Sequence, residues 1–504
     1  MVQATRRQIL RAGAGLGAML VLAACSDDSS DDSSGGGTLR VGALGKVAKL
    51  EQDPHANIPN DSDFLIISLV YDALTVPGGD PNVAARLASS WSSNAEQTHW
   101  TFIIADGARF HDGSPVTVED VVWSLRRLRE IGGESKMPVA KPEDITADGA
   151  NKIVLSLAAP NTQIPLLSRL MTFTVKQGTT DFTQAIGTGP FKLESYRQGN
   201  ARLVRNDAWH GPKPKLDAIE VTLFESVDAL SNAVIGGQID LASNVGAIAG
   251  RTAAGRDGLQ VVRRPNDTAL ALAMRTADGP FADARVRTAL RLAVDRDALI
   301  TPVYSGYGEI ANDVMGTGDP QYDTTIPQRT RDLARARTLL AEAGFDTGRT
   351  YELVTKAEAP GEVESAKLIA TQAREAGIQL EVVVQESNTF YDRTWLNAPL
   401  YTVSWGTNDS TLFYAAKLMI SSSGRNETAF RDPKFDAETA AALAAGNTDA
   451  FTAACKTLQR IQYDRGGYLV WGMGDGIDVA SARVRDLPTL GGFGRMQLER
   501  TWLA

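Results

Sequence analysis

The chain has few of the residues that build disulfide-bonded or metal-binding sites. Its 504 residues include only two cysteines and four histidines. Cys25 lies near the N-terminus in a segment that resembles an export signal, so Cys455 has no partner in the rest of the chain for a disulfide. None of the four histidines, at 55, 99, 111 and 210, stands three or four residues from another, as metal-binding pairs on a helix do. The sequence therefore predicts no metal site of neighbouring histidines, no other cofactor, and a core position for Cys455.

The sequence also lacks the short motifs of common hydrolases. It contains neither the G-x-S-x-G turn of serine hydrolases nor the H-E-x-x-H pair of zinc proteases, and its four histidines supply few general bases. The formal net charge is −9, whereas nucleic acids and anionic membranes attract basic surfaces. These absences argue against an enzyme and against a nucleic-acid partner. An exported hydrolase stays open as a disfavoured alternative.

No hydrophobic run is long enough to cross a bilayer as a helix. The best candidate covers residues 12–24, whereas a spanning helix needs ~20 residues. A basic segment with the twin arginines Arg6 and Arg7 precedes it, and Leu22-Ala23-Ala24-Cys25 follows. This order is typical of a bacterial lipoprotein signal that is cut before a lipidated Cys25. The twin arginines suggest export of a folded protein; general export and an ordinary secretory signal are the alternatives.

Compact domains are expected after a polar tether. The segment SDDSSDDSSGGG, residues 26–37, has no apolar side chain to bury. The remaining length suffices for two or three domains with their own cores. Alternating residues predict a strand near 101–106, and Thr117, followed by Glu119 and Asp120, predicts a capped helix that stops at Gly132-Gly133. Further strands are predicted at 38–43, 217–221, 351–355, 378–385 and 400–405. Further helices are predicted directly after Asp283 and at 331–343, 363–376 and 411–420.

Several strings in this order resemble a known family. The most distinctive is FHDGSPVTVEDVVWS, residues 110–124, and it is similar to the F-x-D-G-x-P-(V/L)-T-x-E-D-V signature of the family-5 extracellular solute-binding proteins. That family comprises the peptide-, nickel- and oligopeptide-binding components of ABC importers. Other matching strings are Asp53-Pro54-His55, IGTGPF at 186–191, FADARVRTAL at 281–290 and LLAEAGF at 339–345.

The resemblance implies an α/β protein with the two-lobed periplasmic-binding-protein-like fold of class II, or cluster C, in which two strands join the lobes and the first lobe carries an inserted subdomain. Hinge closure around a ligand is the behaviour of such folds. The expected organisation is a signal peptide at 1–24, a lipidated Cys25 and flexible linker at 25–37, a discontinuous first lobe at 38–58, 186–268 and 478–504, an inserted subdomain at 59–185, and a second lobe at 269–477.

The resemblance also suggests where the ligand binds. In dipeptide-binding members, a carboxylate after a strand ending in Trp pairs with the peptide ammonium group, and an Arg holds the peptide carboxylate. Here the strand ends at Trp405, Asn408 occupies the carboxylate position and Asp409 could replace it. Lys356 occupies the Arg position and keeps the charge without the bidentate fork. Trp405, Asn408, Asp409 and Lys356 are the predicted ligand-binding residues. The alternatives are a core position for Trp405 and solvated loop charges for Lys356 and Asp409.

The resulting hypothesis is a monomeric extracytoplasmic lipoprotein, anchored to the cell membrane by Cys25 in the bacterial envelope or periplasm. It would capture a peptide or similar small oligomer and deliver it to the permease of an ABC transporter. A non-peptide solute, such as a sugar oligomer or a metal chelate, and a role as a ligand sensor remain open.

Overall fold

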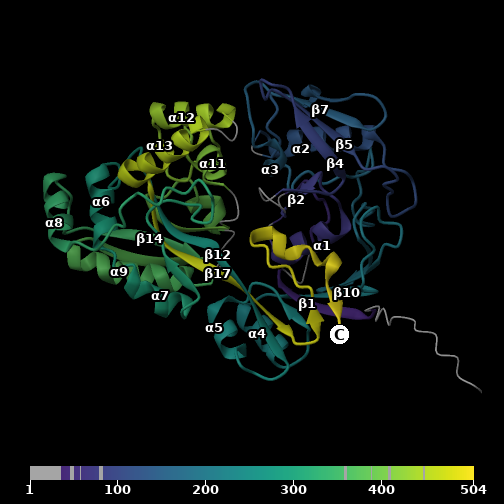
Figure 1. Ribbon diagram of the computed structural model, residues 1–504. Helices are drawn as coiled ribbons and strands as arrows, with labels where there is room; N and C mark the ends of the chain where they lie inside the picture. Colours follow the sequence, from purple (N-terminus) through teal and green to yellow (C-terminus); the bar gives the residue numbers. More distant parts are fainter. Residues whose placement is uncertain are drawn as a thin grey trace, which may run out of the picture. The chain divides into compact units, whose positions relative to one another are not determined.

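The computed structural model describes residues 36–45, 50–56, 58, 60–78, 83–134, 136–356, 360–386, 389–406, 410–445 and 449–504 (Figure 1). The predicted signal peptide, Cys25, Asn408 and Asp409 lie outside these residues.

A mixed sheet of eleven strands forms the backbone of the described structure. β1 and β10 pair in parallel near one end and β14 and β15 near the other, while β12 and β17 run antiparallel between them. These two long strands therefore join the two lobes. In sheet order the strands are β15 (Gln379–Gln385), β14 (Thr350–Lys356), β16 (Leu400–Gly406), β12 (Leu259–Met274), β17 (Tyr468–Ser481), β11 (Leu241–Ala242), β1 (Thr38–Leu44), β10 (Ala218–Phe224), β9 (Asn200–Arg205) and β8 (Phe191–Arg197), with β13 (Gly308–Ile310) paired to β17.

Helices cover both faces of the β14–β16–β12–β17 part of the sheet (Figure 1). The reason is visible in β12, whose successive side chains point to opposite faces. Leu270 and Leu272 belong to one buried core, and Ala269 and Ala271 belong to the core on the other face. The first core includes α6 (Ala284–Ala293), α7 (Asp297–Tyr304), α8 (Leu333–Glu342) and α9 (Glu362–Ala376); the second includes α11 (Thr411–Tyr414), the π-helix η3 (Ala415–Met419), α12 (Pro433–Ala445) and α13 (Asp449–Arg465).

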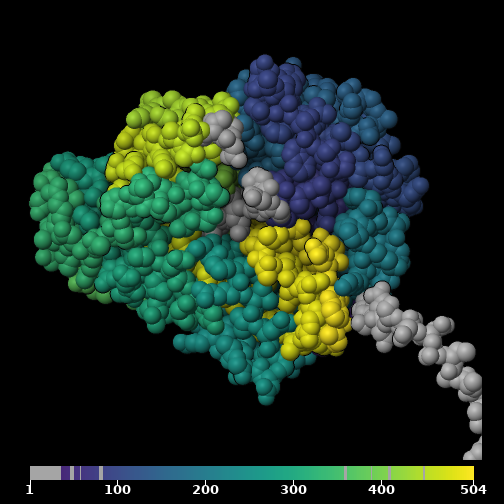
Figure 2. All heavy atoms as spheres, viewed as in Figure 1, coloured from purple at the N-terminus to yellow at the C-terminus, as the bar shows by residue number. Residues whose placement is uncertain are grey.

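Segments far apart in the sequence share the core of the other lobe. Leu39 and Val41 of β1 pack with α1 (Asp61–Val70) and with Val484 and Met496 near the C-terminus. In Figure 2 the yellow C-terminal residues accordingly lie beside the purple and blue N-terminal ones. A neighbouring core lies between the end of β17 and the helices α4 (Val227–Ile235) and α5 (Gly246–Ala253). The C-terminal elements are β18 (Val484–Arg485), η4 (Gly492–Met496), η5 (Leu498–Arg500) and β19 (Trp502–Leu503).

A separate four-stranded sheet packs against the helix in which the signature string ends. Its antiparallel strands pack against α2 (Val118–Gly132), and both form one buried core. The predicted cap is confirmed: the Thr117 side chain accepts from the Asp120 backbone N–H, and Asp120 accepts from Thr117 in return. The strands are β4 (Ala88–Ser93), β5 (His99–Ile104), β7 (Lys152–Ser156) and β6 (Ile145–Ala147); β2 (Thr75–Val76), β3 (Ala84–Ala85), η1 (Pro142–Asp144) and α3 (Ile164–Leu167) lie nearby in the sequence.

Most of the other predicted elements are confirmed, with two corrections. Asp283 caps α6, and β14, α9 and β15 form the predicted parallel unit. The helix predicted from residue 331 begins at Leu333, because the Asp332 side chain accepts from the Arg335 backbone N–H and so caps it. The helix predicted over 411–420 is α-helical only to Tyr414 and continues as a π-helix, in which the Ile420 N–H donates to the Ala415 carbonyl. Cys455 is buried in α13, as predicted.

Candidate functional site

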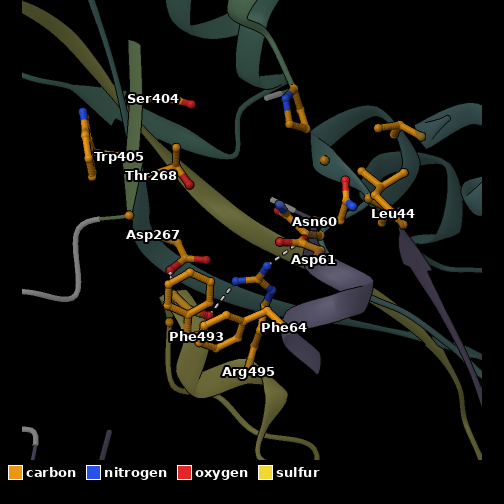
Figure 3. Close-up of a pocket in the computed structure, with 18 of the residues that line it drawn as sticks. Leu44, Asn60, Asp61, Phe64, Asp267, Thr268, Ser404, Trp405, Phe493 and Arg495 are labelled. Atoms are coloured by element: carbon orange, nitrogen blue, oxygen red, sulfur yellow. Dashed lines mark hydrogen bonds and ion pairs between the residues drawn. The ribbon is translucent and has the colours of Figure 1, made fainter. Parts of the chain in front are cut away.

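A cavity of about 1670 Å³ lies between the two lobes. Its lining includes the segments that follow β1 and β10, and the segments that follow β14, β15 and β16. Ligands of open α/β sheets bind at the carboxyl ends of strands, which is where these segments lie. The volume exceeds the ~300–1,000 Å³ typical of small-molecule pockets, so the cavity has room for an elongated ligand. Figure 3 shows part of it, with Trp405 and Ser404 opposite Asn60, Asp61 and Leu44.

Trp405 lines one wall of the cavity and belongs to an aromatic cluster that a buried carboxylate holds. The Trp405 indole N–H donates to Glu427 Oε2 over 3.1 Å. Trp395 donates to Oε1 of Glu427 over 2.8 Å, and the Tyr468 hydroxyl donates to Oε2 over 2.8 Å. Burial raises the pKa of Glu427, and these three hydrogen bonds oppose that effect. Because Trp405 lines the cavity while Glu427 is buried, the carboxylate sets the orientation of this wall.

The structure places Lys356 in a buried ion pair. Its Nζ lies 2.8 Å from Glu362 Oε1 and 4.8 Å from the centre of the Phe390 ring. Glu362 also accepts from the Thr402 hydroxyl. Lys356 is only 2% exposed, and it does not belong to the cavity lining. Of the four predicted ligand-binding residues, Trp405 faces the cavity, and Asn408 and Asp409 lie outside the described residues; the ligand role of Lys356 stays a prediction.

The C-terminal segment builds the opposite wall of the cavity, which was not predicted from the sequence. The rings of Phe64 and Phe493 stack with centroids 3.9 Å apart. Arg495 donates to Asp61 Oδ2 over 2.7 Å, which ties this segment to the start of α1 (Figure 3). Phe493 is half exposed and lies among the glycines at 491, 492 and 494. That aromatic residue within a glycine-rich loop was the only sequence signal for this wall.

A second buried ion pair lies where β12 and β17 cross between the lobes. Arg264 donates to both carboxylate oxygens of Asp478, over 2.7 and 2.9 Å. Pairing of the two strands is interrupted between Arg264 and Thr268, and Asn266 there has a φ of 55°. Asp267, within this interruption, accepts from the Gly492 backbone N–H and lines the cavity. The strand joint is thus linked directly to the loop that carries Phe493.

The described parts of the chain hold no group of three or more His, Cys, Asp or Glu placed to bind a metal ion. Within the same parts, no helix is both long enough and apolar enough to cross a membrane. Two of the histidines, His55 and His111, are enclosed by the fold. Burial lowers the pKa of both to about 4.

Comparison with known proteins agrees with this geometry. Residues 82–427 match the family described as "Bacterial extracellular solute-binding proteins, family 5 Middle". The chain belongs to this family. A relative is the probable D,D-dipeptide-binding periplasmic protein DdpA of Escherichia coli strain K12, which is 26% identical over 58% of this chain. The match spans only 60% of the length of that relative.

Solved structures share the fold of this protein over nearly the whole chain. The periplasmic binding protein DppA of Helicobacter pylori, in complex with the peptide STSA, has a TM-score of 0.81 at 20% identity and covers 94% of this chain and 100% of its own. NikZ of Campylobacter jejuni, in complex with Ni(L-His), has a TM-score of 0.80 at 18% identity, with coverages of 92% and 99%. The fold predicted from the sequence, α/β and two-lobed with the cluster C architecture, is therefore confirmed.

Proposed function

We propose that this chain is an extracytoplasmic solute-binding protein that captures a peptide or similar small oligomer between its lobes and delivers it to an ABC permease. The observation that carries the proposal is the cavity of about 1670 Å³, lined by both lobes and walled by Trp405 on one side and by Phe64 and Phe493 on the other. Membership of family 5 supports a binding role. The peptide names of DdpA and of the H. pylori complex support the ligand class.

Several finer features form part of this proposal. Cleavage before Cys25 and lipidation of its thiol would hold a monomeric domain near the membrane, and the twin arginines Arg6 and Arg7 would direct export. The domain boundaries at residues 58, 185, 268 and 477 belong to the proposal as well. So do contacts of the ligand with Lys356, Asn408 and Asp409.

The test is a thermal and chemical unfolding series of the mature protein against a peptide library. A peptide present at 100 times its Kd should raise the free energy of unfolding by about 2.7 kcal/mol. Trp405→Ala should reduce this ligand-dependent gain, whereas Trp91→Ala on β4, outside the cavity, should leave it unchanged. Stabilisation by a sugar oligomer or a nickel–histidine chelate, with none by peptides, would overturn the peptide assignment and keep the binding role. Solute uptake that is unchanged in a deletion strain would contradict delivery to a permease.

A further inference from the structure

The Asp53-Pro54-His55 turn is part of a rigid polar network beside the cavity. Arg127 of α2 donates to both carboxylate oxygens of Asp53, over 2.8 and 2.6 Å. His55 Nε2 lies 2.8 Å from the Phe173 carbonyl oxygen, and His55 Nδ1 lies 3.0 Å from Arg127 Nη1. Because Nε2 faces a carbonyl and Nδ1 faces a guanidinium, His55 is neutral, with its proton on Nε2. The turn is therefore held by two partners, Arg127 and the Phe173 carbonyl.

This network holds a lysine at the cavity wall. Lys136 Nζ donates to the backbone carbonyls of His55 and Ala56, each over 2.8 Å. An ammonium group has three N–H donors, so one remains after these two bonds. Lys136 is among the residues that line the cavity. Burial lowers the pKa of Lys136, and the charge of Arg425 lowers it further.

Arg425 approaches the same region from the other lobe. It lies between η3 and α12 and also lines the cavity. Its backbone N–H donates to Ser423, whereas its guanidinium has no carboxylate partner within the described ranges of the chain. The carboxylates Glu225 and Glu364 line the cavity at the segments after β10 and β14, and neither pairs with Lys136 or Arg425. The charge of Asp53 also acts on Lys136, but both oxygens of that carboxylate already accept from Arg127.

Two hydrogen bonds link the segment at residues 162–163 to the other lobe. The Thr162 backbone N–H donates to the Leu443 carbonyl over 2.9 Å. The Ser410 hydroxyl donates to Gln163 Oε1 over 3.3 Å. Two like charges that approach each other repel. An anion that binds between them is attracted to both, and this attraction outweighs the repulsion. A bound anion would therefore strengthen the link between the lobes.

We propose that Lys136 and Arg425 form a binding position for a carboxylate of the ligand, held by one cation from each lobe. The proposal rests on the proposed peptide-binding function and deepens it, because it assigns the ligand a negative charge and a direction in the cavity. Asp53, His55 and Arg127 act as positioning residues for Lys136. The carboxylate belongs either to the C-terminus of a peptide or to an Asp or Glu side chain.

The test uses a pool of tripeptides with free C-termini mixed with the same sequences as C-terminal amides. The mature protein is equilibrated with the pool, and bound peptides are quantified by mass spectrometry. Wild-type protein should retain the acids about tenfold over the amides, or should enrich Asp- and Glu-containing amides if a side chain supplies the carboxylate. Lys136→Gln and Arg425→Gln should each remove most of this preference, and Lys136→Arg should restore it. Lys434→Gln, an exposed residue of α12 outside the cavity, is the matched control.

The outcomes separate this proposal from the proposed function. Equal retention of all classes by wild-type protein would overturn the carboxylate site and leave peptide binding intact. A preference that survives both glutamine variants would also overturn it. Retention of no peptide by wild-type protein would contradict the proposed function, and the carboxylate assignment with it. Arg425→Gln removes no side-chain bond to a described residue, so the test does not depend on whether Lys136→Gln folds.

Discussion

At the scale of single residues, Glu427 shows how a buried charge can shape a cavity wall that it does not itself line. Its two oxygens accept from Trp395, Trp405 and Tyr468, so one carboxylate fixes two indoles and a phenol. Removing a partner from such a network leaves buried donors unsatisfied, which costs about 1–3 kcal/mol. The aromatic wall therefore depends on a side chain that lies behind it.

Glu427→Gln should lower the free energy of unfolding by about 2 kcal/mol. The amide group replaces one carboxylate oxygen, so a donor that has an oxygen partner in the wild type would face an N–H₂ group in the variant. Urea unfolding followed by tryptophan fluorescence measures this loss and reports any change around Trp405. Glu381→Gln, an exposed position on β15, is the control and should change stability by less than about 0.5 kcal/mol. Equal stability of the two variants would contradict the structural role of Glu427.

His55 predicts how stability depends on pH. Burial lowers its folded pKa to about 4, below the unfolded value near 6.5. Between these values the unfolded chain binds a proton that the folded chain does not bind, so the free energy of unfolding falls as pH decreases from about 6.5 to about 4. At about 1.36 kcal/mol per unit, the contribution is roughly 3 kcal/mol.

His55→Gln should remove that contribution, so the stability difference between pH 7 and pH 4 should shrink by roughly 2–3 kcal/mol in urea unfolding. His99→Gln, at an exposed position of β5, should keep the wild-type difference. The comparison uses the pH difference within each variant, so an overall loss of stability does not affect it. A variant that retained the full pH difference would show that other groups cause it.

Lys356 shows what the sequence could and could not predict at this scale. Its spacing from the family motifs predicts a position at the end of a strand, and Lys356 is indeed the last residue of β14. Whether the ammonium group can bind a ligand depends on Glu362, six positions later in the first turn of α9, because these two side chains form an ion pair. No local pattern predicts that return contact. Trp405 was easier to place, because the end of a predicted strand in an α/β fold marks the ligand side.

At the scale of elements, α2 was predictable because its signals are local. The Thr117 side chain accepts from the Asp120 N–H, and apolar residues at helical spacing face one core. The segment 411–420 was only partly predictable for the same reason. Its composition indicates a helix, but no local pattern predicts the change to a π-helix after Tyr414, where Leu418 and Met419 are buried in a core shared with distant parts of the chain.

Thr117→Ala tests the cap of α2. The change removes the bond to the Asp120 N–H and should lower the free energy of unfolding by about 1 kcal/mol. Chemical unfolding measures the loss. Thr338→Ala, at an exposed position on α8, removes a threonine that caps nothing and should have little effect. Two equal losses would mean that the cap contributes no more than any helical threonine.

At the scale of the whole molecule, the joint between the lobes is both polar and closely packed. Arg264 faces Gly476 across the two long strands and pairs with the buried Asp478. A side chain on Gly476 would collide with the carboxylate of Asp267, which accepts from the Gly492 N–H. The sequence indicated two lobes through the family resemblance, but neither this joint nor the Phe493 wall was predictable. Both depend on contacts between residues more than 200 positions apart.

Gly476→Ala should displace Asp267 and the loop that carries Phe493. The expected result is a loss of about 1–3 kcal/mol in the free energy of unfolding, together with weaker retention of peptides by the folded protein. Urea unfolding and the mass-spectrometric pool measure the two effects. Gly424→Ala adds its methyl group to open space and should change neither. Unchanged peptide retention in Gly476→Ala would separate the joint from the binding surface.

The shared core of β1 also constrains the order in which the protein can become native. Leu39 and Val41 are among the first residues of the described chain, yet they pack against Ala480, Val484, Met496 and Leu498. A ribosome makes the chain from the N-terminus, so this core stays incomplete until residues 480–498 have been synthesised. Until then the apolar side chains of β1 lack part of their core, and exposed apolar surface favours aggregation and chaperone binding.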